Sequence, residues 1–514
     1  MARGRVQVVR RWPDTADTQA WLSSPRHDLV IESATDSSAD SLAEFAQSEG
    51  PFVEYRRTVR REGDQLVDDT RYRVIIPWFR WLFGPLIRRS VARRAPGPEP
   101  ERLPAWSPPD RLTPRQVRVI GLLAAANLLT AFVNTLFTQT VAFAGDDLGV
   151  GDWGRGVGGT VVRVGILIGL PAALLADRIG RRRVVVVLAW VAPILASLGA
   201  LAPNFGVLVA TQTLSRPLGL ALDLLVAVIA TEEMPRNSRA YAVSILAMAS
   251  GLGAGVAVIS LPLADLGESG WRFVYLLALV WLFVAVDLTR RLPESRRFEW
   301  HMADALADKA PRMHRRRLAT QMSVAFFGNL LLAPASFFQN SFLKDDRGFS
   351  AGGVALFTLV TSTPAVLGLV IGGRVADQRG RRRLAATAAP LGAVLIALSF
   401  WMWGTAMWFG AIAGGLVAAL AYPPLAVYRT EMFGTANRGK AAFLILASAL
   451  LGGSLSLLVT GALLDRGIEH GPIMLALVAG PLVVSALVLF TYPETAHREL
   501  EDINPEDHRL PSNR

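Results

Sequence analysis

Two short stretches decide the fold of this sequence: residues 176–183 are ADRIGRRR and residues 376–383 are ADQRGRRR. The second stretch repeats the first about two hundred residues later, and each separates two apolar runs long enough to cross a membrane. A second echo keeps nearly the same spacing: Glu232 and Arg239 recur as Glu431 and Arg438. The chain therefore contains two related halves.

The composition indicates a membrane protein. Of the 514 residues, 52% are hydrophobic and 18% are charged, which is more apolar than a soluble domain requires. The formal net charge is +11, but the cations concentrate in short loops between apolar runs, so membrane topology explains them and no nucleic-acid partner is expected. The chain has no cysteine, which excludes disulfides and thiolate metal sites.

About twenty apolar residues form one membrane crossing. By this criterion we predict six spans in each half. The predicted spans are 116–143, 157–176, 184–202, 206–230, 240–264 and 271–291, then 318–341, 352–375, 384–404, 406–428, 440–463 and 472–492.

The loop charges predict the orientation of these spans. Arginine clusters occupy alternate loops, around residues 178–183, 236–239, 290–317, 379–383 and 438–440. By the positive-inside rule these loops are cytoplasmic. We therefore predict a multi-pass protein of the cell inner (plasma) membrane with both termini in the cytoplasm.

The two basic turns, at matching places in two six-span halves, resemble the signature loops of the major facilitator superfamily of secondary transporters. The first copy departs from the family pattern, with Ala173 where a glycine is usual, whereas Gly373 keeps it. Residues 293–295 (PES) and 493–495 (PET) are similar to motifs of the sugar-porter branch and its metabolite:proton symporter relatives.

The resemblance implies an all-α membrane protein with twelve transmembrane helices in two six-helix bundles. The bundles would span residues 115–292 and 318–492, joined by a cytoplasmic loop at 293–317 and followed by a cytoplasmic tail at 493–514.

The resemblance also implies a gate at the cytoplasmic mouth. The aspartates of the two turns would accept hydrogen bonds from helix N-termini of the other half, and the adjacent arginines would pair with the glutamates that end spans 4 and 10. The alternative is that these charges only fix topology. The predicted gate residues are Asp177, Arg178, Arg181, Glu232, Arg239, Asp377, Arg381, Glu431 and Arg438.

Residues 1–94 are expected to form a small cytoplasmic α+β unit, joined to the first bundle by a proline-rich linker at 95–114. We predict strands at 6–9, 29–31, 52–59 and 66–76, the last two as a hairpin, and a helix at 38–47. The segment from Trp78 to Arg94 is aromatic on one side and rich in arginine. It predicts either an interfacial amphipathic helix that contacts anionic headgroups of the lipid bilayer, or a closing helix packed on the sheet.

Charged residues inside the spans are candidate functional groups, because burying a charge in the membrane is expensive. Arg216 lies about ten residues into span 4, roughly 15 Å deep. In the sugar-porter branch an arginine here pairs with a carboxylate of span 1, but this chain has Asn134 there, which cannot titrate. Asp223 is the nearest intramembrane acid and Arg163 is a second cation. Arg216 could instead be a structural tether.

Four further polar side chains are candidates for the same substrate and proton pathway. They are Asn127, Gln212, Asn329 and Tyr422.

The leading hypothesis is a secondary active transporter that moves a small polar or anionic metabolite by alternating access, coupled to protons as in symport. It is expected to work as a monomer without a cofactor or metal. Two alternatives stay open: an efflux carrier of amphipathic compounds or lipids, and a transport-inactive membrane sensor or anchor for the N-terminal unit. No spacing typical of a catalytic triad, a metal site or a phosphate loop occurs, so an enzyme is not expected.

Overall fold

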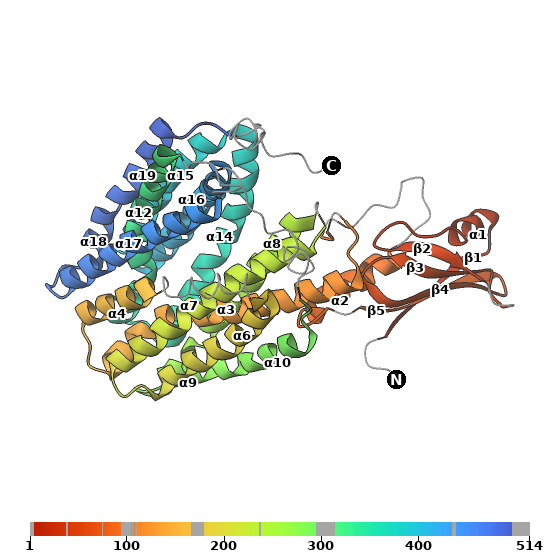
Figure 1. Cartoon of the computed structure of the whole chain (residues 1–514), viewed down its shortest axis with the longest axis horizontal. Helices are drawn as coiled ribbons and strands as arrows, with labels where there is room; N and C mark the ends of the chain where they lie inside the picture. The colour runs from red at the N-terminus through yellow and green to blue at the C-terminus, as the bar shows by residue number, and fades with distance from the viewer. Residues whose placement is uncertain are drawn as a thin grey trace.

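The computed structural model describes residues 5–36, 40–74, 76–93, 104, 106–108, 110–165, 179–235, 238–294, 314–433 and 438–495, apart from some side chains within helices. A small sheet at the N-terminal end stands beside a large helical part (Figure 1). The predicted fold class, a helical membrane protein with a small N-terminal α+β unit, is confirmed.

The N-terminal unit is a five-stranded antiparallel sheet in the order β1-β5-β4-β3-β2. The predicted hairpin is present, because β4 pairs with β5 and Glu62 lies opposite Gln65. Gly63 supplies the positive φ, 62°, that the two-residue turn needs. The strands are β1 (Val6–Pro13), β2 (Ile31–Thr35), β3 (Ala43–Glu49), β4 (Phe52–Glu62) and β5 (Gln65–Val74).

The helix predicted at 38–47 is wrong, since residues 43–49 form β3. Alanine, glutamate and glutamine favour helices, but this strand pairs with β2 on one side and β4 on the other. Phe45 of β3 is buried, and Cζ of Arg57 lies 4.1 Å from the centroid of its ring. The first helix of the unit is instead α1 (Ala16–Leu22), whose N-cap Thr15 accepts a hydrogen bond from the amide of Thr18.

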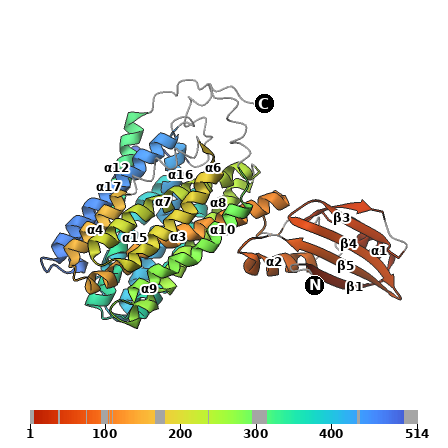
Figure 2. The same ribbon diagram turned by 60° about the horizontal axis from the view of Figure 1, so that its bottom comes forward.

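Helix α2 (Arg80–Ala92) closes the unit. Its residues Ile87 and Val91 pack on the sheet against Phe52 and Tyr72, so the structure shows the second of the two alternatives for this segment. Figure 2 shows α2 between the sheet and the bundles. Just before the helix, Trp78 donates a hydrogen bond from Nε1 to Asp287 at the end of span 6, at 3.3 Å.

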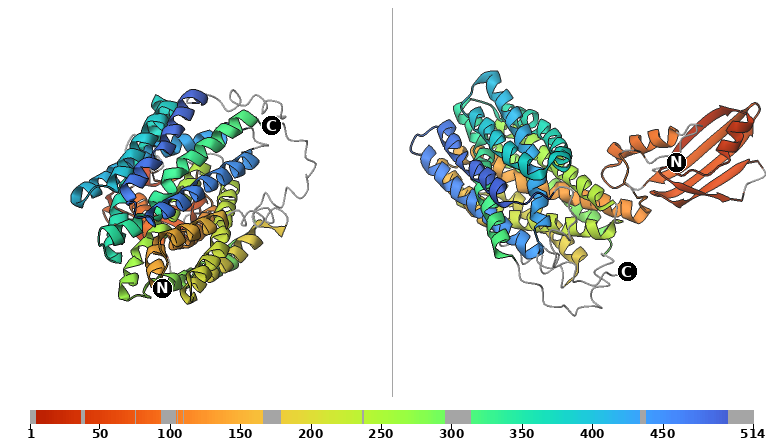
Figure 3. Two further views of the ribbon diagram at one scale, coloured as in Figure 1. Left: turned by 90° about the vertical axis from the view of Figure 1, so that its left-hand side faces the viewer. Right: turned by 90° about the horizontal axis from the view of Figure 1, so that it is seen from above.

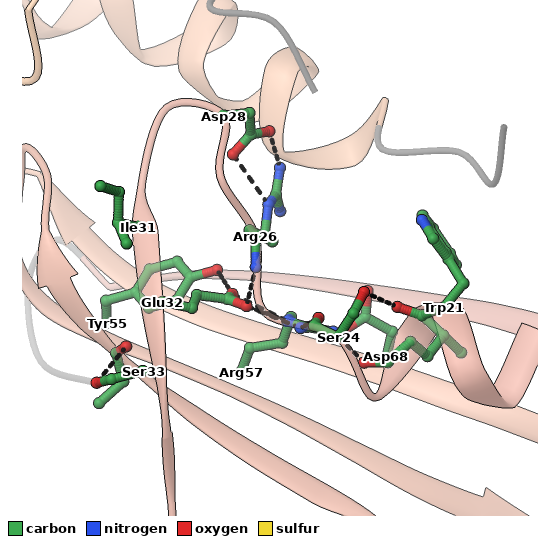
Figure 4. Close-up of polar contacts among 12 residues, drawn as sticks. Trp21, Ser24, Arg26, Asp28, Ile31, Glu32, Ser33, Tyr55, Arg57 and Asp68 are labelled. Carbon is green, nitrogen blue, oxygen red and sulfur yellow. Dashed lines mark hydrogen bonds and ion pairs between the residues drawn. The ribbon is translucent and has the colours of Figure 1, made fainter. Parts of the chain in front are cut away.

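The core of the N-terminal unit also holds charge (Figure 4). Arg57 is fully buried, pairs with Glu32 at 2.8 Å and with Asp68 at 3.8 Å, and donates to the carbonyl oxygens of Leu22 and Ser24. The hydroxyl of Tyr55 donates to Glu32 as well. Each charge in this network therefore has an opposite charge beside it.

In the described part of the chain, eleven helices are long and apolar enough to cross a membrane. Span 2 is entered by α4, and its remainder lies outside the described residues. Figure 3 shows the helices of the first half beside those of the second.

The first half contains α3 (Pro114–Asp147), α4 (Asp152–Gly165), α6 (Arg181–Ser197), α7 (Phe205–Glu233), α8 (Arg239–Ile259), η4 (Leu261–Leu266), α9 (Trp271–Leu276) and α10 (Leu282–Arg291). The second half contains α12 (Arg315–Phe337), α13 (Gln339–Ser341), η6 (Phe342–Asp346), α14 (Ala351–Arg379), α15 (Arg381–Ser399), α16 (Gly404–Glu431), α17 (Arg438–Leu464), α18 (His470–Leu477) and α19 (Ala479–Thr491).

Candidate functional site

Arg163 of α4 crosses from the first bundle to the second. Its Nη2 donates a hydrogen bond to Oδ1 of Asn329 in α12, at 2.9 Å. Its guanidinium also lies against Gly453 of α17, where an added Cβ would come within 2.6 Å of Nε. This Nε is buried and has no hydrogen-bond partner. The residue thus contacts two helices of the second bundle and keeps unused donor capacity.

Arg216 of α7 is the second cation of this region. Its Nε is also buried without an acceptor, and its guanidinium lies close enough to Arg163 for the two charges to repel each other. Among the described residues, no carboxylate forms an ion pair with either arginine. Asn134 of α3 contacts α7 at Gly219, one turn after Arg216, and its Oδ1 is likewise buried and unpartnered. The result is a positively charged region between the bundles.

The remaining predicted pathway residues lie elsewhere. Asp223 is partly buried in α7, and the charge that acts on Arg216 is Arg163 and not Asp223. Asn127 donates to the carbonyl of Leu246 and to Ser250, inside the first bundle. Gln212 donates to the carbonyl of Ala196, also inside that bundle, and Tyr422 is exposed on α16. The structure therefore brings together Arg163, Arg216, Asn134 and Asn329.

We call the helix ends that carry the two basic turns the basic face, and the other ends the opposite face. On the basic face, Gly180 and Gly380 precede α6 and α15 with φ of 104° and 102°. Glu294 accepts a hydrogen bond from the amide of Arg182, at 3.0 Å, and Glu494 accepts from the amides of Arg381 and Arg382. Each carboxylate satisfies free N–H groups at a helix start in its own half.

This capping role was missed from the sequence, where the two Pro-Glu motifs served only to indicate a family branch. The available signal was their recurrence about two hundred residues apart, in step with the glycines that precede α6 and α15.

Most residues of the predicted gate, or their side chains, lie outside the described part of the chain. Asp177 and Arg178 lie outside the described residues, as do the side chains of Glu232, Arg239, Asp377, Glu431 and Arg438. Arg381 donates from Nη1 to Thr495, at 3.2 Å, a contact within the second half. Arg181 is the first residue of α6. A gate built from these residues remains a prediction.

The opposite face holds a cluster of ion pairs between the bundles. Arg155 at the start of span 2 pairs with Asp146 of α3 and, at 3.3 Å, with Asp345 of η6. Lys344 pairs with the same Asp146, and Asn340 donates to the carbonyl of Gln139 at 2.7 Å. These contacts hold the two halves together on the opposite face.

Comparison with known proteins supports this architecture. Residues 318–511 match the model of the Major Facilitator Superfamily. The xylose transporter XylE from E. coli, in an inward open conformation, has 16% identity, covers 76% of this chain and 99% of its own, and superposes with a TM-score of 0.62.

Two other solved structures give similar values. The nucleoside transporter NupG has 12% identity, covers 73% of this chain and 100% of its own, and gives a TM-score of 0.62. A bacterial homologue of the human lysosomal transporter Spinster, in an inward-facing and occupied conformation, has 17% identity. It covers 77% of this chain and 98% of its own, with a TM-score of 0.59. No curated protein matches the sequence. The second half thus matches the model of the Major Facilitator Superfamily, and the membrane part shares the fold of these transporters.

Proposed function

We propose that the protein is a secondary active transporter that moves a small anionic metabolite by alternating access. The observation that carries this proposal is the pair Arg163 and Arg216, two cations inside the membrane part whose Nε atoms lack acceptors. An unpaired buried charge is costly, and a bound anion would supply the missing partner.

The chemistry of guanidinium suits this task. A planar guanidinium binds a carboxylate or phosphate through two parallel hydrogen bonds, which fixes the anion's orientation. Arg163 already contacts Asn329 of the second bundle, so an anion held by Arg163 and Arg216 of the first bundle would lie beside the second. A substrate site shared by two bundles is the arrangement that rocking of one bundle against the other requires.

The orientation forms part of the proposal. We place the basic face in the cytoplasm, and the cell inner membrane is the membrane concerned, because the arginine-rich loops lie on that face. The N-terminal unit would then lie in the cytoplasm. Although α2 packs on the sheet, its arginines Arg80, Arg88 and Arg89 are exposed, and we propose that they contact anionic headgroups. The ion pairs of the opposite face support an inward-facing state.

We propose Asp223 as the proton-coupling residue, since among the carboxylates of α7 it is nearest to Arg216 in the sequence. Transport of Asp223→Asn should be measured under a pH gradient and in counterflow. Loss of accumulation with retained counterflow supports coupling at Asp223, whereas unchanged accumulation contradicts it.

The anion site is tested in proteoliposomes. Uptake of a panel of small carboxylates and phosphates should identify a substrate, and Arg163→Gln and Arg216→Gln should each lower its uptake by about tenfold or more. The matched control is Arg272→Gln, because Arg272 bonds to the carbonyls of Ala200 and Ala202 within the first bundle. The proposal fails if a neutral compound is transported and both variants behave like Arg272→Gln.

One observation favours a second candidate, the transport of amphipathic compounds or lipids. A cavity of about 80 Å³, room for a short apolar group and not for a whole lipid, lies where α2 meets spans 1 and 5, and apolar side chains dominate its lining, among them Phe83, Trp106, Ile120 and Ile245. Transport of a fluorescent phospholipid that is unaffected by Arg163→Gln would favour this candidate over the anion carrier.

A further inference from the structure

Two aspartates on the opposite face occupy equivalent positions in the two halves. Asp265 lies in η4, after span 5, and Asp465 follows span 11, two hundred residues later. This is the spacing of the basic turns, so the repeat that relates the two halves also relates these two acids. Neither aspartate belongs to the ion-pair cluster around Arg155.

Asp265 of the first bundle binds the start of α14 in the second bundle. Its Oδ1 accepts from the amide of Ala351 at 2.8 Å, and its Oδ2 accepts from the amide of Gly352 at 2.9 Å. Within its own helix, α14 satisfies the next two amides through Ser350: the side chain accepts from Gly353, and the carbonyl accepts from Val354. The first two amides of α14 therefore receive their acceptors from the other bundle.

Asp465 of the second bundle makes the reciprocal contact. Its Oδ1 accepts from the amide of Trp153, at 3.1 Å, at the start of α4 in the first bundle. The approach is close, because a Cβ added to Gly151 would lie 3.3 Å from the same oxygen. Span 2 thus receives its cap from the end of span 11, and span 8 receives its cap from the end of span 5.

We infer that Asp265 and Asp465 help to close the opposite face beside the ion pairs around Arg155, as two symmetric clamps between a carboxylate and the helix N-terminus of the opposite bundle. A carboxylate at a helix start satisfies free N–H groups and interacts favourably with the helix dipole. When the opposite face opens, the bundles separate and both clamps must break. Each clamp therefore stabilises the closed state of that face.

The two clamps differ in strength. Asp265 accepts two hydrogen bonds, whereas Asp465 accepts one. The helix that Asp465 caps also begins with an acid, Asp152, so the two carboxylates repel each other. Both clamps remain accessible to water, so each should change the closed-to-open ratio by roughly two- to fivefold, and Asp265 by more than Asp465.

The test measures the distance between bundles with spin labels. The chain has no cysteine, so Leu201→Cys and Thr405→Cys give one label in each bundle, at exposed positions of the opposite face. In the labelled full-length protein, Asp265→Ala should shift the distance distribution toward longer distances. Asp465→Ala should cause a smaller shift, and Asp265→Asn should lie between Asp265→Ala and the parent. In the double variant, the ratio of open to closed populations should rise about tenfold.

Asp147→Ala is the matched control. Asp147 is a carboxylate of the same face that accepts from the indole of Trp271 within the first bundle, so its loss should leave the distances unchanged. The inference is overturned if the double variant keeps the parent distribution, or if Asp147→Ala shifts it equally. The inference rests on the alternating access proposed above, but the measurement needs no substrate, so its failure is distinct from failure of the anion site.

Discussion

The N-terminal unit and the membrane part bury arginine in opposite ways. In the sheet, Arg57 is fully buried, with Glu32 and Asp68 beside it and two carbonyl oxygens as further acceptors. Between the bundles, Arg163 has a neutral partner and Arg216 has another cation nearby. A matched charge network stabilises one conformation, whereas an unmatched cation is available to a ligand. On the function proposed above, the contrast is between a structural role and a binding role for the same residue type.

The largest effect is expected from removing the matched cation. Arg57→Met should destabilise the N-terminal unit by about 3–5 kcal/mol, because it leaves Glu32 as a buried carboxylate without its ion pair. Hydrogen exchange of the β4 and β5 amides of the full chain in increasing denaturant measures this. Arg61→Met is the control, since its pair with Asp14 is half exposed and should be worth less than about 1 kcal/mol. Equal destabilisation by Arg57→Met and Arg61→Met would contradict the structural role of the buried ion pair.

The second effect concerns pH. Burial, followed by the nearby charge of Glu32, raises the pKa of Tyr55 well above its usual value of 10. The folded unit therefore favours the neutral phenol. Its contribution to stability is complete below pH 10, and it is lost as the pH rises toward the folded pKa, by up to about 1.4 kcal/mol per pH unit. Tyr55→Phe should reduce this slope in the same exchange experiment, leaving the part that comes from Tyr72, whose pKa is also raised by burial. An unchanged slope would contradict the assignment.

Removing Arg216, which has no acidic partner among the described residues, is expected to affect stability less and transport more. Arg216→Met should change the thermal stability of the membrane part by no more than about 1 kcal/mol, or raise it, while transport of the anion is lost. Unfolding in detergent, followed by loss of monodisperse protein, gives the stability. A loss as large as that of Arg57→Met would instead identify Arg216 as a structural tether between spans.

The smallest effect is expected from a substitution that displaces the guanidinium of Arg163. In Gly453→Ala the new Cβ would lie 2.6 Å from Nε of Arg163, so the guanidinium must move. Because the guanidinium ends a flexible side chain, stability should change by less than about 0.5 kcal/mol. The KM for the anion should rise about three- to tenfold. Gly251→Ala, where a Cβ meets open space in α8, is the control, and an equal rise in KM there would contradict the prediction.

Local patterns in the sequence determined the larger outline. Runs of about twenty apolar residues specify membrane helices whatever surrounds them, because the bilayer requires every backbone group to be paired within the helix. The recurrence of 176–183 at 376–383 specified two related halves, and Gly63 specified the β4–β5 hairpin. These features depend on neighbours in the chain, so periodicity and turn chemistry were sufficient.

Contacts between distant segments were decided only by the tertiary structure. Residues 43–49 form a strand because β2 and β4 flank them, although their composition favours a helix. Arg163 meets Asn329, and Asp265 meets the start of α14, across the interface between bundles. A hydrogen bond of this kind depends on how two helices are placed, and hydrophobic periodicity specifies which face of a helix is buried but not which polar side chain lies opposite.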